Sequence, residues 1–269
     1  MKHQTLELEV LNHVGIIWFN RPDIRNALNE TVLKELGTAL TALEKDKGVR
    51  AVVLAGRGSA FCAGADLNWM KKTASYSKAQ NLKDAKVGLA DTLYKLHALK
   101  KPTVARVHGP AFAGGMGFVA ACDIAVASTE ATFCLSEVKL GLTPATISPY
   151  VIRAMGERAA SRYALTAERF DAAEAYRIGF VQELVPPDEL DGKVNELLGA
   201  LVQAGPRAID ETKKLIALSG GTKLTAAVRM ETAKRIAETR ASAEGREGIA
   251  SFLEKRKPKW VTELKLEEQ

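Results

Sequence analysis

The stretch from Arg106 to Pro144 limits the possible folds of this chain more than any other part of the sequence. An apolar, β-branched segment, Pro102–Val107, leads into it, and the glycine pair Gly114-Gly115 separates that segment from a second apolar one, Met116–Cys122. This order predicts a buried strand, a tight turn and a helix. Glycine lets a ligand approach bare backbone, and the first N–H groups of a helix have no partner within it. Because the helix dipole adds positive charge there, the turn is suited to holding a developing negative charge.

A single acidic residue, Glu137, follows the next predicted strand, Ala131–Leu135. Its neighbours are apolar except for Lys139, so one interpretation is a buried carboxyl group with a raised pKa, which can act as a general acid or base. In the other interpretation Glu137 is only the first acid of a short helix capped by Ser136. The first interpretation predicts a proton-transfer site at the glycine turn.

A second glycine turn, Ala63–Asp66, follows the predicted strand Val49–Leu54. Both glycine turns stand at the carboxyl ends of strands, where open α/β sheets bind their ligands. If the turns converge, one N–H group from each would hold a thioester carbonyl as it gains enolate character. The alternative is that each glycine only closes a short connection between a strand and a helix.

Strands and helices alternate as far as the segment Val181–Val185, and only helices are expected after Asp188. The sequence therefore predicts an α/β core, residues 1–190, followed by a helical region, residues 191–269. The charged end of the chain, Thr262–Gln269, is expected to be disordered. Further expected elements are strands at Thr5–Val10 and Gly15–Phe19 joined by a turn at Asn12-His13, and helices at Thr31–Glu44, Lys78–Leu99, Leu190–Leu201, Arg207–Leu218, Leu224–Glu238 and Ala243–Lys255.

The composition argues against several classes of protein. No apolar run approaches the ~18 residues of a membrane span, and no signal peptide is recognisable, so no membrane partner is expected. Three cysteines, an odd number, fit a reducing compartment, which predicts a cytoplasmic location. The net charge of +6 is accompanied by only 6% aromatic residues, so nucleic-acid binding is not expected. The histidines lack metal-ligand spacing, and the motifs GxxxxGK[ST], GxGxxG and GxSxG are absent, so we expect no metal, nucleotide cofactor or serine nucleophile.

Several longer motifs together carry a family resemblance across nearly the whole chain. They are NRPDIRNAL, GSAFCAGADL, KPTVARVHGPAFAGGMGFVAACDIAVA, ATFCLSEVKLGL, LTAERFDAAEAYRIGFVQELVP and FLEKRKPKW. With them the chain resembles the crotonase (enoyl-CoA hydratase/isomerase) superfamily. The resemblance implies a ClpP/crotonase-like β-β-α superhelix of the α/β class, with C-terminal helices that assemble a homotrimer or a dimer of trimers. It also implies an acyl-CoA thioester substrate, with CoA as part of the substrate and no separate cofactor.

The resemblance also implies roles for particular residues. The N–H groups of Ala65 and Gly114 would form an oxyanion hole, with Glu137 as the catalytic acid and base. The residues implied at CoA are Arg25, Ala63, Asp66 and, from a C-terminal helix that is often the neighbouring subunit's, Lys255. The residues expected to line the acyl pocket, with a plain core role as the alternative, are Trp69, Met70, Gly117, Phe118 and Pro144.

Gly117 departs from the family's usual pattern. Hydratases of the family usually carry two glutamates, and the first would fall at Gly117, so water addition by two carboxylates does not transfer to this chain. The segments GADLNWM, GGMGFVAACDIA and FCLSEVKLGLTPATISPYVIRAMGER resemble bacterial methylglutaconyl-CoA hydratases of leucine catabolism and related hydratases of acyclic terpene breakdown.

This finer resemblance predicts a hydro-lyase that adds water to a branched, carboxylated enoyl-CoA. Such a substrate would bring its own carboxylate, which would partly replace the missing glutamate. Two alternatives remain open. One is an enoyl-CoA isomerase that uses Glu137 alone, and the other is a non-catalytic acyl-CoA- or RNA-binding member of the fold.

Overall fold

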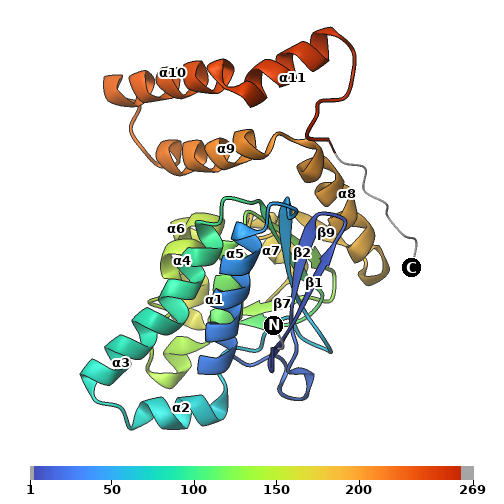
Figure 1. Cartoon of the computed structure of the whole chain (residues 1–269). Helices are drawn as coiled ribbons and strands as arrows, with labels where there is room; N and C mark the ends of the chain where they lie inside the picture. Colours follow the sequence, from blue (N-terminus) through green and yellow to red (C-terminus); the bar gives the residue numbers. More distant parts are fainter. Residues whose placement is uncertain (1–2, 262–269) are drawn as a thin grey trace.

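The computed structural model describes residues 3–261 of the chain (Figure 1). The segment 262–269, predicted to be disordered, lies outside the described residues. A six-stranded sheet in the order β1-β2-β3-β4-β6-β9 forms the centre. The first two strands are antiparallel and all other neighbours are parallel. Its strands are β1 (Leu6–Leu11), β2 (Val14–Phe19), β3 (Ala51–Gly56), β4 (Thr103–Val107), β6 (Ile124–Ser128) and β9 (Glu183–Val185).

The hairpin of β1 and β2 closes one edge of this sheet. Asn12 and His13 connect the two strands with positive φ angles of 48° and 68°. Positive φ at both central residues is typical of a type I′ turn, whose twist matches that of the flanking strands. The turn predicted at Asn12-His13 is therefore confirmed, with β1 as an edge strand.

A second, three-stranded sheet brings two chemically important segments together. It consists of β5 (Ala111–Phe112), β7 (Thr132–Cys134) and β8 (Phe170–Asp171), with β5 parallel to β7 and β7 antiparallel to β8. The glycine turn before α5 follows β5, and Glu137 follows β7. Because parallel strands end at the same edge of a sheet, these two segments start side by side.

The main core lies between one face of the large sheet and a layer of helices (Figure 1). Asn29 caps the first of them, since its Oδ1 accepts a hydrogen bond from the N–H of Val32 at 3.0 Å. The apolar residues spaced for a helix face, among them Leu36 and Leu40, are buried as predicted. The helices of this layer are α1 (Glu30–Lys45), α4 (Asp91–His97), α5 (Gly114–Ala121) and α6 (Ser148–Thr166).

The helix predicted over Lys78–Leu99 is present, but it consists of three parts. A π-helical turn, η2 (Lys86–Ala90), separates α3 (Lys78–Ala85) from α4. π-turns inside helices occur frequently at functional sites. The remaining short helices are η1 (Pro22–Ile24), α2 (Leu67–Ala74), η3 (Glu137–Leu140), α7 (Ala172–Arg177) and η4 (Pro187–Glu189).

Helix α8 (Leu190–Gln203) covers the opposite face of the large sheet. Leu190, Val194, Leu198 and Val202 pack there against apolar residues of the strands. The boundary predicted between residues 190 and 191 groups α8 with the C-terminal helices, whereas its apolar stripe is part of the packing of the core.

Three helices stand away from the core: α9 (Pro206–Ser219), α10 (Ala226–Ala241) and α11 (Ala243–Leu253) (Figure 1). Lys213 ties α9 to the core, because its ammonium group lies 2.7 Å from an oxygen of Asp123. Apolar side chains on and next to these helices are exposed, such as Leu224, Met230 and Phe252. Among the described residues, no helix is both long enough and apolar enough to cross a membrane.

Candidate active site

The two glycine turns predicted from the sequence lie against each other. Cys62 and Ala111 form a parallel bridge, and the N–H of Phe112 donates to the carbonyl of Cys62 at 2.9 Å. Two residues beyond that bridge, a Cβ atom placed on Gly64 would lie 3.4 Å from the Cβ of Ala113. The convergence that the sequence left open is therefore present in the structure.

Ala65 and Gly114 each lie three residues beyond the bridge, on neighbouring segments. Ala65 is exposed and directly precedes Asp66, the N-cap of α2, and Gly114 is the first residue of α5. Within residues 3–261, neither of their N–H groups has a hydrogen-bond partner. Two such donors can stabilise an oxyanion, and the helix dipole is positive at the start of α5, where Gly114 lies.

Close backbone approach at this turn requires glycine. A Cβ atom on Gly115 would collide with the carbonyl oxygen of Cys62, well inside the 3.0 Å that real Cβ contacts respect. Ala113 has a positive φ angle of 47°, which is strained for a residue with a side chain. Its N–H donates to the carbonyl of Cys134 at 2.9 Å, so β7 holds the turn in this conformation.

Glu137 is the first residue of η3, three residues after Cys134. The residue is half-buried, and its Oε2 atom is buried without a hydrogen-bond partner among the described residues. Burial raises the pKa of the Glu137 carboxyl group above its ordinary value, although its own backbone N–H partly offsets that effect. The side chain of Ser136 makes no capping hydrogen bond to any described residue, so the interpretation of Glu137 as part of a capped helix start lacks its main contact.

The residues predicted to bind CoA lie together, apart from Lys255. The carbonyl of Arg25 accepts a hydrogen bond from the N–H of Ala63 at 2.9 Å, and the Arg25 residue is exposed. Asp66 is buried next to them, and its carboxylate already bonds Arg21 at 2.8 Å and the N–H of Asn68 at 2.8 Å. Burial alone would raise the pKa of Asp66, but these hydrogen bonds lower it overall.

Arg21 has a part in this site that the sequence analysis missed. Its side chain reaches both Asp66 and, at 2.6 Å, the carbonyl of Ala27, so it holds the loop before α1 against the loop before α2. The pairing of Arg21 with an acid 45 positions away has no local signal in the sequence.

Lys255 lies at the C-terminal end of α11, exposed and with a positive φ angle of 54°. Figure 1 shows α11 well separated from α2 and from the loops that precede it. A single chain therefore does not bring Lys255 next to Arg25 and Ala63.

The residues predicted for the acyl pocket differ in their exposure. Trp69 and Met70 of α2 are half-buried, and Pro144 is half-buried at a cavity of about 310 Å³ that Leu135 also lines. Phe118 is fully buried, with its ring centroid 5.7 Å from that of Phe19, so in this structure it is a core residue. Gly117 is buried one helical turn beyond Gly114.

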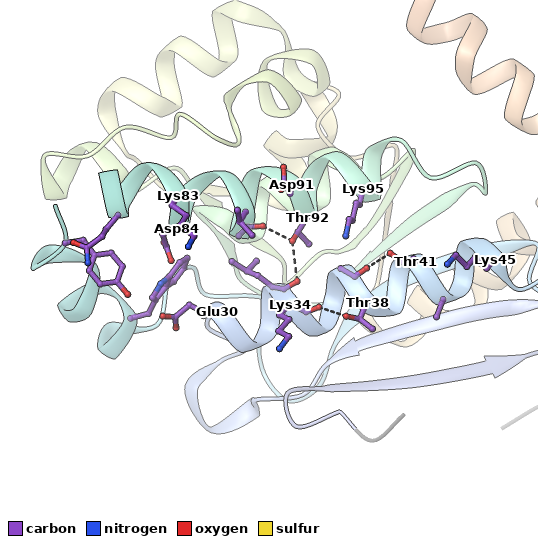
Figure 2. Close-up of a pocket in the computed structure, with 18 residues that line it drawn as sticks. Glu30, Lys34, Thr38, Thr41, Lys45, Lys83, Asp84, Asp91, Thr92 and Lys95 are labelled. Carbon is purple, nitrogen blue, oxygen red and sulfur yellow. Dashed lines mark hydrogen bonds between the residues drawn. The ribbon is translucent and has the colours of Figure 1, made fainter. Parts of the chain in front are cut away.

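A groove of about 970 Å³ runs between α1 and the long helix formed by α3, η2 and α4 (Figure 2). Trp69 is among the residues that line it, whereas Ala65, Gly114 and Glu137 are not. The side chain of Thr92 reaches the carbonyl of Leu33 at 3.3 Å and joins the two walls. The groove is therefore a neighbour of the candidate site and is separate from the oxyanion donors.

Other potential nucleophiles and ligands are less well suited to chemistry. Burial raises the pKa of the Cys62 thiol to about 12, so its thiolate is scarce at neutral pH. One ring nitrogen of His108 lies 2.8 Å from the carbonyl of Gly58, so this histidine satisfies a turn. Within residues 3–261, no three side chains of His, Cys, Asp or Glu are grouped so that they could hold a metal ion.

The fold and the candidate site define a class of protein: a crotonase-fold enzyme that acts on acyl-CoA thioesters. The chain belongs to the enoyl-CoA hydratase/isomerase family, whose sequence model matches residues 9–263. The predicted fold class and the predicted enzyme class, enoyl-CoA hydratase, are thereby confirmed.

Similar proteins cover almost the whole chain. The crystal structure of an enoyl-CoA hydratase from Shewanella pealeana is 40% identical with a TM-score of 0.93, over 96% of this chain and 97% of that one. Pseudomonas aeruginosa AtuE is 37% identical with a TM-score of 0.90, over 96% of this chain and 100% of that one. The crotonyl-CoA hydratase of Syntrophomonas wolfei is 31% identical over 265 residues, which are 97% of this chain and 100% of the relative.

Proposed function

We propose that this enoyl-CoA hydratase acts on a branched, carboxylated enoyl-CoA, of the 3-methylglutaconyl-CoA or isohexenylglutaconyl-CoA and γ-carboxygeranoyl-CoA type. The reaction adds water across the 2,3-double bond, in leucine or acyclic terpene catabolism. The observation that carries the proposal is the Oε2 atom of Glu137, which is buried and has no hydrogen-bond partner within residues 3–261. Glu137 follows the strand that holds the donor turn at Ala113. The finer sequence resemblance around GADLNWM and FCLSEVKLGL supports the substrate class.

In this proposal one carboxyl group carries both proton transfers. The carboxylate of Glu137 takes a proton from water while the oxygen of that water adds to C3. The negative charge moves onto the thioester oxygen, where the N–H groups of Ala65 and Gly114 stabilise it. Glu137 then gives the proton to C2 and returns to its charged form. A pKa raised by burial favours this double role, because it brings the group closer to the pH at which it must both accept and donate.

Gly117 supports the single-acid character of the proposal. The side chain of Ile147 lies over Gly117, and Leu93 lies 3.5 Å from the point that a Cβ atom would occupy there. Residue 117 therefore contributes no acid, and its surroundings are apolar. A carboxylate carried by the substrate would supply negative charge in its place.

The test compares two substrates that differ only in the carboxylate. We expect kcat/KM for 3-methylglutaconyl-CoA to exceed that for 3-methylcrotonyl-CoA by at least ~10-fold, which corresponds to ~1.4 kcal/mol. The absorbance of the conjugated thioester reports hydration in both cases. Equal values, or a preference for the substrate without the carboxylate, would reject the substrate class while leaving the hydratase activity in place.

A second candidate reaction, movement of the double bond from the 3- to the 2-position, rests on the same lone carboxyl group. Glu137 alone would remove one proton and return it two carbons away. Incubation with a 3-enoyl-CoA distinguishes this reaction, because an isomerase forms the conjugated thioester and increases its absorbance. A hydratase leaves the absorbance of a 3-enoyl-CoA unchanged and decreases it only with a 2-enoyl-CoA. Faster turnover of the 3-enoyl-CoA would favour the isomerase.

We further propose a trimer or a dimer of trimers in the cytoplasm. Exposed apolar side chains on and near α9–α11, such as Met230 and Phe252, support assembly through these helices. Assembly would also bring Lys255 of a neighbouring copy to the CoA phosphates. Three unpaired cysteines support a reducing compartment. Sedimentation analysis tests the assembly, and a stable monomer at micromolar concentration would contradict it.

A further inference from the structure

Leu28 lies between the two turns that carry the oxyanion donors. Its N–H donates to the carbonyl of Gly64 at 2.8 Å, and its carbonyl accepts the N–H of Asp66 at 2.8 Å. These two bonds form a parallel bridge with Ala65, the residue between them. In such a bridge the bracketed residue's own N–H points away from the bonding strand, so the backbone of Leu28 fixes Ala65 and leaves its donor unused.

The side chain of Leu28 reaches the other donor. Its Cδ1 lies 2.8 Å from the point that a Cβ atom would occupy on Gly114, so it rests directly on the start of α5. Leu28 is only 2% exposed, which leaves it little room to change position. One residue therefore holds the first donor through its backbone and contacts the second through its side chain.

Arg21 stabilises the pairing of Leu28 with Ala65 through bonds to the residues beside them. It donates to the carbonyl of Ala27, the residue before Leu28, and pairs with Asp66, the residue after Ala65. Asp66 also accepts the N–H of Asn68 and so fixes the start of α2. The Leu28–Ala65 bridge is thus held on both of its strands.

We propose that Leu28 is a positioning residue that sets the separation between the N–H groups of Ala65 and Gly114. The inference rests on the proposed function, because it takes these two groups as the oxyanion hole. Oxyanion donors act only when they lie about 2.7–3.1 Å from the oxygen that becomes charged, so a small change in their separation weakens the transition state more than the bound substrate. Shortening Leu28 should therefore lower kcat and leave KM nearly unchanged.

The experiment compares Leu28→Ala with Leu40→Ala, a change of the same size at a buried position of α1 in the same core. Both variants should lose thermal stability to a similar extent. With crotonyl-CoA, Leu28→Ala should lower kcat by about 10–100-fold at nearly unchanged KM, and Leu40→Ala should keep kcat within about 2-fold. Leu28→Met, which preserves the reach of the side chain, should retain most of the activity. Leu28→Val provides an intermediate case if the alanine variant does not fold.

Equal kcat in Leu28→Ala and Leu40→Ala, or a loss confined to KM, would overturn the role of Leu28. So would a kcat in Leu28→Met as low as in Leu28→Ala. Failure of the proposed function is recognised separately, because Glu137→Gln would then keep its turnover. An inactive Glu137→Gln combined with a fully active Leu28→Ala would reject only the positioning role.

Discussion

Ile147 lies directly over Gly117, with its Cγ2 atom well inside 3.0 Å of the point that a Cβ atom on Gly117 would occupy. Ile147 is 1% exposed and belongs to the main core, and it reaches α5 from the segment before α6. The two residues are complementary in size, since the absence of one side chain makes room for the other. This pairing explains in steric terms why an acid is missing at position 117.

The pairing predicts that a side chain at position 117 is tolerated only when Ile147 is smaller. Gly117→Ala should lower the free energy of unfolding by about 1–3 kcal/mol, the usual cost of overpacking, as measured by urea denaturation. Ile147→Ala removes Cγ2 but keeps Cβ, which lies 2.9 Å from the point that a Cβ atom on residue 117 would occupy, so it should relieve most but not all of the clash in the double variant. Ile147→Val, which keeps Cγ2, should not relieve it. Additive effects in the alanine pair would contradict the pairing.

The Ile147→Ala background also allows a glutamate to be placed at position 117, where hydratases of the family usually carry one. Gly117→Glu alone should be poorly folded, and Gly117→Glu combined with Ile147→Ala should fold better. If the substrate's carboxylate replaces a missing acid, this double variant should gain kcat/KM on 3-methylcrotonyl-CoA relative to 3-methylglutaconyl-CoA. An unchanged ratio of the two values would argue against the electrostatic replacement.

Glu137 is predicted to make the folded protein less stable at neutral pH. Burial raises its pKa in the folded state above the value of about 4.3 in an unfolded chain. As the pH rises from the unfolded to the folded value, the unfolded state releases the proton first, so stability is lost over that window. Glu137→Gln should therefore have a higher Tm than the wild type at pH 7 and a similar Tm below about pH 4.

The activity of the same variant should change in the opposite direction. We expect kcat to fall by about 10²–10⁴-fold, the usual contribution of a general acid and base. Glu130→Gln, at an exposed position, is the matched control for both measurements. A pH-independent difference in Tm, or unchanged turnover, would remove Glu137 from its proposed role.

Replacement by alanine should have opposite effects on stability at Gly115 and at Gly192. Gly115→Ala places a methyl group against the carbonyl of Cys62 and should both destabilise the protein and lower kcat, because the donor turn must move. Gly192 lies in the exposed part of α8, and a Cβ atom there would meet no atom of the described residues within 4 Å apart from the helix's own backbone and its chain neighbours. Gly192→Ala should therefore stabilise the protein by about 0.5–1 kcal/mol. Thermal unfolding and crotonyl-CoA hydration measure both effects. Similar changes in Tm and kcat in the two variants would show that the close approach of the Cys62 carbonyl does not require glycine at position 115.

Removing Arg21 should leave Asp66 buried and unpaired. The side chain of Asp66 is 8% exposed and that of Arg21 20%, so Arg21→Met should cost free energy at the lower end of the ~3–5 kcal/mol seen for broken buried pairs. The paired Asp66 has a lowered pKa, so its contribution is present above the unfolded pKa of about 3.9 and is lost as the pH falls through the lower folded value. The difference between wild type and variant should therefore shrink in acid.

Asp66→Asn in the Arg21→Met background is the control for this prediction. It removes the unpaired charge, so the double variant should recover part of the stability at pH 7. If the double variant is no more stable than Arg21→Met, Arg21 acts mainly through its bond to the carbonyl of Ala27.

The sequence alone determined many of the elements and their order, although the π-helical turn within Lys78–Leu99 and the short strands β5 and β8 were not predicted. The helix α1 was predictable because Asn29 caps it and its apolar residues recur at the helical period. The hairpin turn at Asn12-His13 and the strand–glycine–helix order at Gly114 are likewise local, since propensity and periodicity act over a few residues. The family motifs extended this to the fold class and to enoyl-CoA hydratase activity in general.

Only the tertiary structure decided which of these segments meet. Gly64 and Ala113, Arg21 and Asp66, and Gly117 and Ile147 are each far apart in the chain, and nothing local in either member identifies its partner. The same holds for the buried oxygen of Glu137, which lacks a hydrogen-bond partner in the part of the chain that the structure describes. It also holds for the placement of Phe118 in the core, because an apolar residue in a predicted helix does not show which way it faces. The physical reason is that local conformational preferences fix each element, whereas contacts between distant residues depend on the path of the whole chain around its shared core.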